Sequence, residues 1–279
     1  MKKLVSVCVL LLTVASFAQS KLTFDKRFIQ AEDQWVALRP DSLGVHLLGF
    51  VYIDEEAGPT FDYAGSFTIQ SDGRFSFTKK ETQGSMKSRL EPSNVLVAII
   101  PESHYPDLGV NRYPDWLRFY KTNENAASRL FKWGFIYNSW NECEKALEFL
   151  EKAYKQNPDY EGLRVELAFS YNCLKQFEKA DVILTEAVKK QPLDAYINKE
   201  LIYTQLHVGD IEKAKKTYWN FLKKGTDKTY NSENAFNILG TYFQKGDSKS
   251  FYEWLSKTEL ENDAKFEKYI TAMKQRLPK

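Results

Sequence analysis

The sequence predicts an α+β protein of two domains, a small antiparallel β-sheet or sandwich followed by an all-α array of helical hairpins. Residues 34–102 are rich in β-branched and aromatic residues, with polar side chains alternating between them, which is typical of strands. After the segment 101–114, which holds three prolines and a glycine, the apolar residues recur with the period of a helix. We therefore place a leader at residues 1–18, a β domain at 19–110 and a helical domain at 111–279.

The N-terminal stretch MKKLVSVCVLLLTVASFAQS has the pattern of a secretory signal peptide. Lys2 and Lys3 precede an apolar run at positions 4–14, and Ser16-Phe17-Ala18 is a small-x-small cleavage signal. The ending FAQ resembles signal peptides that are common in Bacteroidetes. We expect cleavage after Ala18 and export to the periplasm, the outer surface or the medium.

The rest of the chain has the composition of a folded domain protein, since the sequence is 43% hydrophobic and 27% charged. No later segment has the roughly 18 uninterrupted apolar residues of a membrane helix, so no integral membrane segment is expected after cleavage. A net charge of +2 lacks the strong basic balance of nucleic-acid binders, and we expect no nucleic-acid partner.

Five segments in the first half read as strands, at residues 35–39, 44–54, 60–70, 74–80 and 94–100. The dipeptide Asp72-Gly73 predicts a hairpin turn between the third and fourth. Gly49 and Gly65, inside strands, indicate bulges or bends. The run VLVAII is apolar on both faces and is expected inside the sheet.

The second half repeats one amphipathic helix at a constant interval. The stretch EKALEFLEKAYKQNP at 144–158 is followed by EKADVILTEAVKKQP at 178–192, and then by EKAKKTYWNFLKKGT at 212–226. Two successive units also share a pattern of large, small and aromatic residues: Trp133-Gly134, Tyr137, Ala146, Leu150, Ala153 and Pro158, then Leu167-Ala168, Tyr171, Ala180, Leu184, Ala187 and Pro192. The pattern resembles the tetratricopeptide repeat, a helix-turn-helix unit of about 34 residues.

The resemblance implies four stacked hairpins and a cap. We place the units at about 127–160, 161–194, 195–232 and 233–262, with a capping helix at 262–277. The third unit lacks the second alanine and the closing proline, and the fourth is displaced by a longer loop.

The resemblance also implies that the first helix of each unit lines a concave face, on which a peptide or protein segment binds. The residues expected on this face are Phe131, Phe135, Asn138, Phe169, Asn172, Tyr196, Lys199 and Tyr203. The lysine, asparagine and arginine set with which chaperone adaptors of this family hold a terminal carboxylate is missing, because Lys199 stands alone. One alternative stays open, in which the β domain or the N-terminal arm covers the aromatic residues.

No catalytic, cofactor or metal site is expected. His46, His104 and His207 are isolated from other metal-ligating residues, and no nucleophile or phosphate-binding motif is present. The chain is therefore expected to be a non-enzymatic extracytoplasmic interaction module. The alternative is glycan binding or a role as an uptake accessory protein, prompted by four aromatic residues of the β domain: Trp35, Tyr52, Phe61 and Tyr63.

Two cysteines, Cys143 and Cys173, remain after cleavage. Export would allow a disulfide between them. We expect two buried free thiols instead, because a chain with a core of this size does not require a covalent link.

Overall fold

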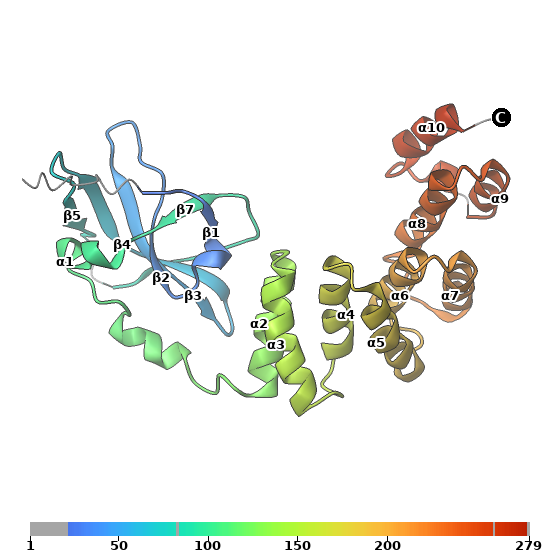
Figure 1. The fold of residues 1–279 in the computed structure, drawn as a ribbon, viewed down its shortest axis with the longest axis horizontal. Coiled ribbons are helices and arrows are strands. Elements are labelled where there is room, and N and C mark those ends of the chain that lie inside the picture. The colour runs from blue at the N-terminus through green and yellow to red at the C-terminus, as the bar shows by residue number, and fades with distance from the viewer. Residues whose placement is uncertain (1–21, 82–83, 259, 278–279) are drawn as a thin grey trace, which may run out of the picture. The chain divides into compact units, whose positions relative to one another are not determined.

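The computed structural model describes residues 22–81, 84–258 and 260–277. It divides into two compact units, Met1–Tyr120 and Lys121–Lys279, which we call the β unit and the helical unit (Figure 1). The predicted leader lies outside the described residues and remains a prediction. None of the helices among these residues combines the length and apolar character that a membrane span needs.

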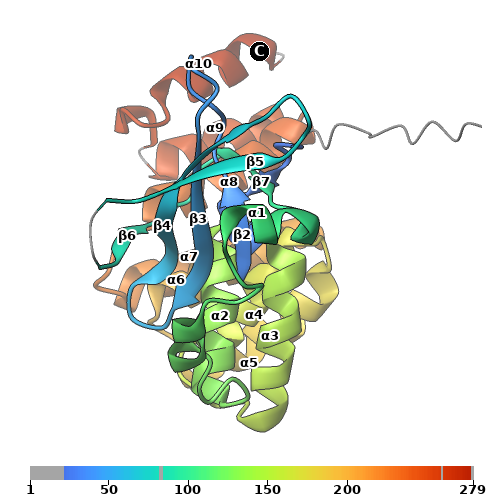
Figure 2. The same ribbon diagram turned by 90° about the vertical axis from the view of Figure 1, so that its left-hand side faces the viewer.

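The β unit contains one antiparallel sheet. Its strands are β1 (Lys26–Arg27), β2 (Gln34–Ala37), β3 (His46–Asp54), β4 (Gly58–Ile69), β5 (Phe75–Lys79), β6 (Met86–Arg89) and β7 (Leu96–Ile99). They are ordered β1-β7-β2-β3-β4-β5. Strand β5 pairs with the C-terminal part of β4, and β6 pairs with its N-terminal part. Figure 2 shows β3 and β4 side by side, with β6 beside β4.

The five predicted strands are confirmed as β2, β3, β4, β5 and β7, and the last lies between β1 and β2 as its two apolar faces indicated. The described strands form a single sheet rather than a two-sheet sandwich. Our reading of the sequence missed β1, which is very short, and β6, whose residues are all exposed.

The predicted bulge lies in the β3–β4 pair. Leu48 faces Gly65, whereas Gly49 faces Tyr63, so β4 carries one extra residue at this point. A Cβ atom on Gly49 would lie 2.3 Å from the Phe61 ring, which explains the glycine. The predicted turn is also present, and Gly73 has a φ of +86° there.

The core of the β unit is aromatic. Phe50 and Tyr52 of β3 are fully buried, and their core cluster includes residues of two short helical segments, α1 (Tyr105–Leu108) and η3 (Asp115–Tyr120). Trp116 of η3 contacts both rings edge to face, at 5.8 Å and 4.9 Å. The β unit therefore extends to Tyr120, past the boundary that we predicted at residue 110, because these aromatic residues complete its core.

In its described residues, the helical unit forms four α-helical hairpins, a short 3-10 helix η4 (Leu260–Asn262) and a final α-helix. The hairpins are α2 (Ala127–Ser139) with α3 (Cys143–Gln156), α4 (Leu163–Cys173) with α5 (Phe177–Lys190), α6 (Ala195–His207) with α7 (Ile211–Lys224), and α8 (Asn231–Gln244) with α9 (Ser248–Thr258); α10 (Glu267–Arg276) follows. Figure 1 shows them in this succession. The predicted helical array is confirmed, and its last helix is shorter than the predicted 262–277.

Small residues allow the two helices of a hairpin to approach closely. Ala146 and Ala153 of α3 are fully buried, and a Cβ atom on Gly134 of α2 would lie 2.3 Å from the Leu150 side chain. The turn inside each hairpin contains one residue with positive φ, and these are Asn141, Lys175, Gly209 and Gly246. The first three are spaced by the repeat interval, so the turns repeat with the helices.

A disulfide joins Cys143, the first residue of α3, to Cys173, the last residue of α4. Our expectation of two free thiols was wrong. The repeat stacks consecutive hairpins so that these two helix ends meet, with Cα atoms 6.3 Å apart, which is within the usual range for a disulfide. The bond therefore links the first unit to the second.

Candidate functional site

The first helices of the four hairpins, α2, α4, α6 and α8, carry the residues that we expected to face a partner. We call these the A helices. The structure divides the eight expected residues into two groups. Phe131, Phe135, Phe169, Tyr196, Lys199 and Tyr203 are partly or largely exposed, whereas Asn138 and Asn172 are 3% and 4% exposed. The two asparagines are therefore not available to a bound peptide, which corrects our prediction.

Both asparagines instead join neighbouring A helices. The Nδ2 atom of Asn138 in α2 donates to Glu166 of α4, at 2.9 Å from its backbone oxygen and 2.9 Å from Oε2. The hydroxyl of Ser170, one turn along α4, donates to Asn138 Oδ1 at 2.7 Å. Each polar atom of the buried amide thus has a partner, as burial requires.

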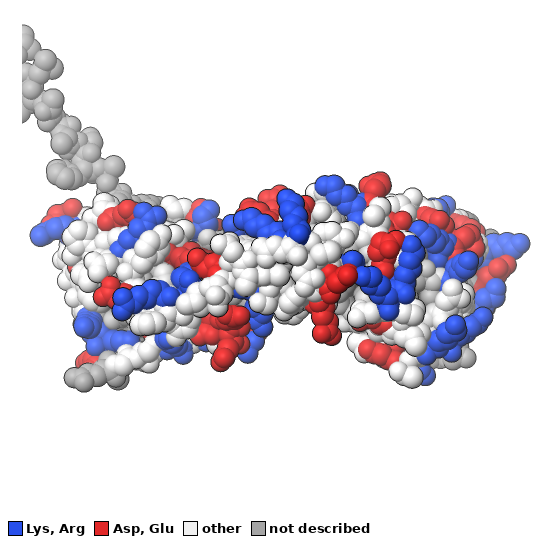
Figure 3. All heavy atoms as spheres, turned by 90° about the horizontal axis from the view of Figure 1, so that it is seen from below, with Lys and Arg blue, Asp and Glu red and all other residues white. Residues whose placement is uncertain are grey.

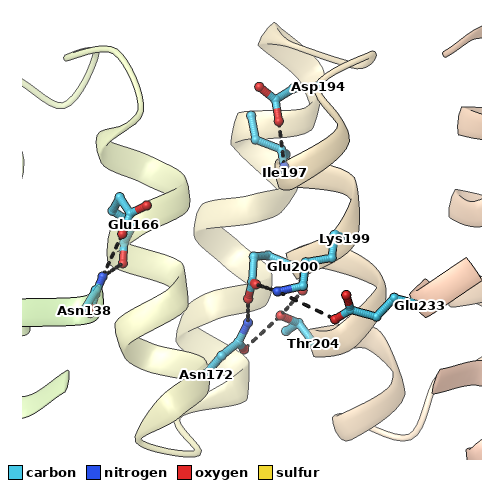
Figure 4. Close-up of polar contacts among 9 residues, drawn as sticks. All are labelled: Asn138, Glu166, Asn172, Asp194, Ile197, Lys199, Glu200, Thr204 and Glu233. Carbon is cyan, nitrogen blue, oxygen red and sulfur yellow. Dashed lines mark hydrogen bonds and ion pairs between the residues drawn. The ribbon is translucent and has the colours of Figure 1, made fainter. Parts of the chain in front are cut away.

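The same arrangement recurs in the next unit. The Nδ2 atom of Asn172 in α4 donates to Glu200 Oε2 of α6 at 3.0 Å, and the Thr204 hydroxyl lies 2.9 Å from Asn172 Oδ1. Lys199 then pairs with Glu200 at 2.8 Å and reaches Glu233 of α8 at 4.0 Å. Figure 4 shows these contacts crossing from helix to helix. We call the whole set the polar ladder.

The ladder follows the repeat of the sequence. Its three positions recur at the repeat interval, as Asn138 and Asn172, Glu166 and Glu200, and Ser170 and Thr204. One repeat later the corresponding residues are Leu206, Asn234 and Ile238, so the asparagine-glutamate pair is not continued. Glu166 and Glu200 are charged residues that recur at the repeat interval. Their recurrence was the signal in the sequence that could have revealed the ladder.

Burial and neighbouring charges together shift the pKa values of the ladder residues. Burial raises the pKa of Glu166, and the nearby Glu200 carboxylate raises it further, although the hydrogen bond from Asn138 acts in the opposite direction. Burial also raises the pKa of Tyr196, with added repulsion from the Glu166 and Glu200 carboxylates. Burial alone would lower the pKa of Lys199, but Glu200 and Glu233 more than offset it and the pKa is raised. Lys199 therefore stays protonated.

A pocket of about 290 Å³ lies between the beginnings of α4 and α6 and the middle of α2. Its apolar part comes from Val165 and three aromatic residues, Phe131, Phe135 and Tyr196, and Phe135 is 45% exposed. The rings of Phe131 and Phe135 are 6.4 Å apart, and the Tyr160 ring lies 5.1 Å from Phe131. Three of the eight predicted residues thus meet in one hollow, which has room for one large side chain.

Three carboxylates and the Gln191 amide form the polar part of this pocket. Glu161 and Asp194 are exposed, and Glu166 is 6% exposed. Asp194 precedes α6 and caps it, with Oδ1 accepting from the Ile197 amide at 2.8 Å (Figure 4). Our sequence reasoning missed these three residues: Glu161 and Asp194 lie between helices, and Glu166 lies on α4 but was not considered.

The other predicted residues lie elsewhere on the A helices. Tyr203 packs against His207 and Phe177, with ring centroids 4.1 Å and 6.4 Å away. Phe169 is half-buried on α4. At the far end of the unit, Figure 3 shows positive and negative side chains interspersed over α7–α10. The strongest grouping of predicted residues is therefore the pocket near α2.

The histidines are dispersed in the structure. His46 is stacked between Phe24 and Phe67, and the His104 Nδ1 atom lies 3.0 Å from Asp107, which lowers the pKa of that carboxyl. His207 lies on the exposed side of α6. Among the described residues, no group of three potential ligands is placed to hold a metal ion.

The aromatic residues that suggested glycan binding belong mainly to the core of the β unit. Trp35, Tyr52 and Phe61 are 7%, 0% and 8% exposed, and Tyr63 is half-buried. Glycan recognition needs aromatic faces open to solvent, so these residues give the alternative no support.

Comparison with known proteins agrees with the repeat pattern. Residues 142–199 match the family model of the tetratricopeptide repeat, and this range covers α3 to the first part of α6. The match lies within the helical unit, whose hairpins form an array like that of tetratricopeptide repeats. No curated protein matches the sequence.

Several solved structures are similar at low identity. MamA from MSR-1 is 16% identical with a TM-score of 0.44, over 52% of this chain and 82% of that chain. TTC0263, a thermophilic repeat protein in Thermus thermophilus, is 17% identical with a TM-score of 0.44, over 57% and 87%. BtubC from P. vanneervenii is 18% identical with a TM-score of 0.39, over 55% and 66%.

Proposed function

We propose that this tetratricopeptide repeat protein is a non-enzymatic interaction scaffold outside the cytoplasm, which binds an extended segment of another protein along the concave face of its A helices. The observation that carries the proposal is the pocket between α2, α4 and α6. Partly exposed aromatic side chains there converge with polar groups, which is the composition of an anchoring site for a partner's side chain.

The polar ladder supports this role by holding the A helices in register. A binding face gains affinity when its side chains are already in position before the partner arrives, because less conformational entropy is then lost. Asn138 and Asn172 each connect two successive A helices, and the disulfide connects the first two units at one end. The face that carries Phe131 and Phe135 is thus rigidly supported.

Export is supported by two independent features. The N-terminal sequence has the pattern of a cleavable leader, and disulfides persist mainly in oxidising compartments. N-terminal sequencing of the mature protein from a fractionated source cell should find Gln19 first, in the periplasmic, surface or medium fraction. An intact Met1 terminus in the cytoplasmic fraction would contradict the extracytoplasmic part of the proposal.

The binding role can be tested with peptides of known sequence. Peptides selected from a random display library against the full disulfide-bonded chain are titrated against wild type, Phe135→Ala and Phe119→Ala. Phe119 is a matched control, because it is 69% exposed but lies in the β unit. We expect Phe135→Ala to weaken binding by about tenfold or more, as for an interface anchor, and Phe119→Ala to change it by less than about twofold.

Two results would contradict the proposal. The first is a library that yields no specific peptide. The second is a set of peptides whose affinity is unchanged by Phe135→Ala, because such peptides would bind somewhere other than the A-helix face.

A further inference from the structure

The pocket between α2, α4 and α6 is acidic. Three of its lining residues are carboxylates, Glu161, Glu166 and Asp194, and its described lining residues include no lysine, arginine or histidine. A negative, partly enclosed site attracts a positively charged group and repels an anionic one. A partner segment that enters this pocket is therefore expected to bring a cation.

The positive side chains near the pocket already have acidic partners. Arg164 and Lys190 both pair with Asp159, and the Arg164 distance is 2.7 Å. Lys199 pairs with Glu200 and Glu233. These ion pairs involve other carboxylates, and Asp194 is met by the backbone amide that it caps. Among the described residues, no positive side chain therefore forms an ion pair with Glu161 or Asp194 in the pocket.

Aromatic rings define which cation fits. Phe131 and Phe135 line the same pocket, with their ring centroids 6.4 Å apart, and the Phe135 side chain is 45% exposed. A guanidinium group is planar, so it can stack on an aromatic face while its N–H groups donate to carboxylates at its edge. An ammonium group is a more strongly hydrated point charge and gains less from such a site.

We propose that the pocket binds an arginine side chain of the partner segment, with the guanidinium between the phenylalanine rings and the carboxylates of Glu161 and Asp194. This inference rests on the proposed function and specifies the chemistry of its anchor. Burial of Glu166 at the base of the pocket agrees with it, because a docked cation would stabilise the ionised form of that carboxyl, whose pKa is raised in the free protein.

The experiment varies the charge and the shape of the peptide's anchoring side chain separately. Peptides recovered by display are synthesised with their arginine kept, replaced by citrulline, which is its neutral analogue, or replaced by lysine. Each is titrated against wild type and Glu161→Gln/Asp194→Asn, in which asparagine can still cap α6. The control is Glu178→Gln/Asp210→Asn, which removes the same charge from α5 and from the cap of α7.

We expect citrulline to weaken binding to wild type by about tenfold or more, the effect of losing hydrogen bonds between charged groups. The Glu161→Gln/Asp194→Asn variant should weaken the arginine peptide similarly and should no longer distinguish it from the citrulline peptide. The control variant should retain the discrimination of wild type. Lysine should bind more weakly than arginine, because it lacks the planar fork.

The outcomes separate this inference from the proposed function. Recovered peptides without arginine, equal affinity of arginine and citrulline peptides, or equal affinity of lysine and arginine peptides would each overturn it. If Phe135→Ala still abolishes binding in those cases, the A-helix face remains a peptide site with another anchor. If no peptide binds wild type, both proposals fail.

Discussion

Replacing Asn172 by leucine tests the polar ladder directly. The Asn172 amide is 4% exposed and lies 3.0 Å from Glu200 Oε2 and 2.9 Å from the Thr204 hydroxyl, and both partners are also buried. A hydrogen bond to a charged group contributes about 1.5–3 kcal/mol and a neutral one about 1 kcal/mol. We therefore expect Asn172→Leu to lower the free energy of unfolding by about 3 kcal/mol.

Leucine is a suitable replacement because it occurs naturally at the same position of the next repeat. Leu206 occupies the corresponding position one repeat later, where the partner positions are Asn234 and Ile238. The destabilisation should thus come from the buried Glu200 and Thr204 groups that lose a partner, rather than from the shape of the side chain. In the double variant Asn172→Leu/Thr204→Ile, the free energy of unfolding should fall by about 1 kcal/mol less than the sum of the two single losses. Each single variant breaks the same Asn172–Thr204 hydrogen bond, so the sum counts that bond twice.

The assay is urea unfolding of the full chain, followed by circular dichroism at a helical wavelength. With a slope of about 2 kcal/mol/M, a loss of about 3 kcal/mol moves the midpoint down by about 1.5 M. Asn220→Leu is the control, since Asn220 is an exposed asparagine of α7, and we expect a change below about 0.5 kcal/mol. If Asn172→Leu changes the free energy of unfolding by no more than this control does, the ladder makes no net contribution to stability and the reasoning is wrong.

Three further predictions concern the helical unit. Because burial raises the pKa of Glu166 in the folded state above its ordinary value of 4.5, folding loses stability as the pH rises from that value through the raised pKa. The free energy of unfolding of wild type should therefore fall relative to that of Glu166→Gln as the pH rises above 4.5 in urea titrations, and a constant difference would be inconsistent with this. Denatured, unreduced protein that begins at Gln19 should contain no titratable thiol, and reduction should cost about 3–4 kcal/mol for cysteines 30 residues apart; two free thiols would show that the disulfide is absent. Gly134→Ala should cost about 1–3 kcal/mol, because the new methyl group would meet a buried leucine at 2.3 Å, whereas Gly240→Ala, with nothing within 4 Å, should be neutral or stabilise by up to about 1 kcal/mol. Equal effects of the two alanines in thermal unfolding would refute the packing explanation.

The repeat architecture could be predicted because its cause is local and periodic. Ala146 and Ala153 return as Ala180 and Ala187 one repeat later, and close helix packing requires small residues at those positions. The strands of the β unit could be placed for a similar reason, since alternation along a strand is visible without any partner. Strand β6 could not, because all its residues are exposed and no alternation marks it.

The candidate site was predicted in part. The helical register placed Phe131 and Phe135 on one face of α2, since residues three and four apart share a helix face, and both line the pocket together with Tyr196. The same register could not show that Asn138 and Asn172 face the neighbouring helix, because this depends on how successive units stack. The recurrence of asparagine at the repeat interval, as Asn138 and Asn172, was the signal in the sequence that could have indicated this role.

The acidic part of the pocket depends on tertiary structure. Glu161 and Asp194 lie in successive turns between units, and neither belongs to a periodic pattern of apolar residues. They approach the same hollow only because consecutive hairpins stack side by side. The disulfide has the same origin, since the beginning of α3 and the end of α4 meet only in the folded array.

Hydrogen exchange of the full chain, with and without a display-selected peptide, tests the central claim most directly. Proposed binding along the A helices predicts slower exchange in the bound state for amides of α2 and of the beginnings of α4 and α6, where Phe135 and Tyr196 lie. The outer helices α3, α5 and α7 should change little. Protection confined to those outer helices or to the β unit would contradict the account.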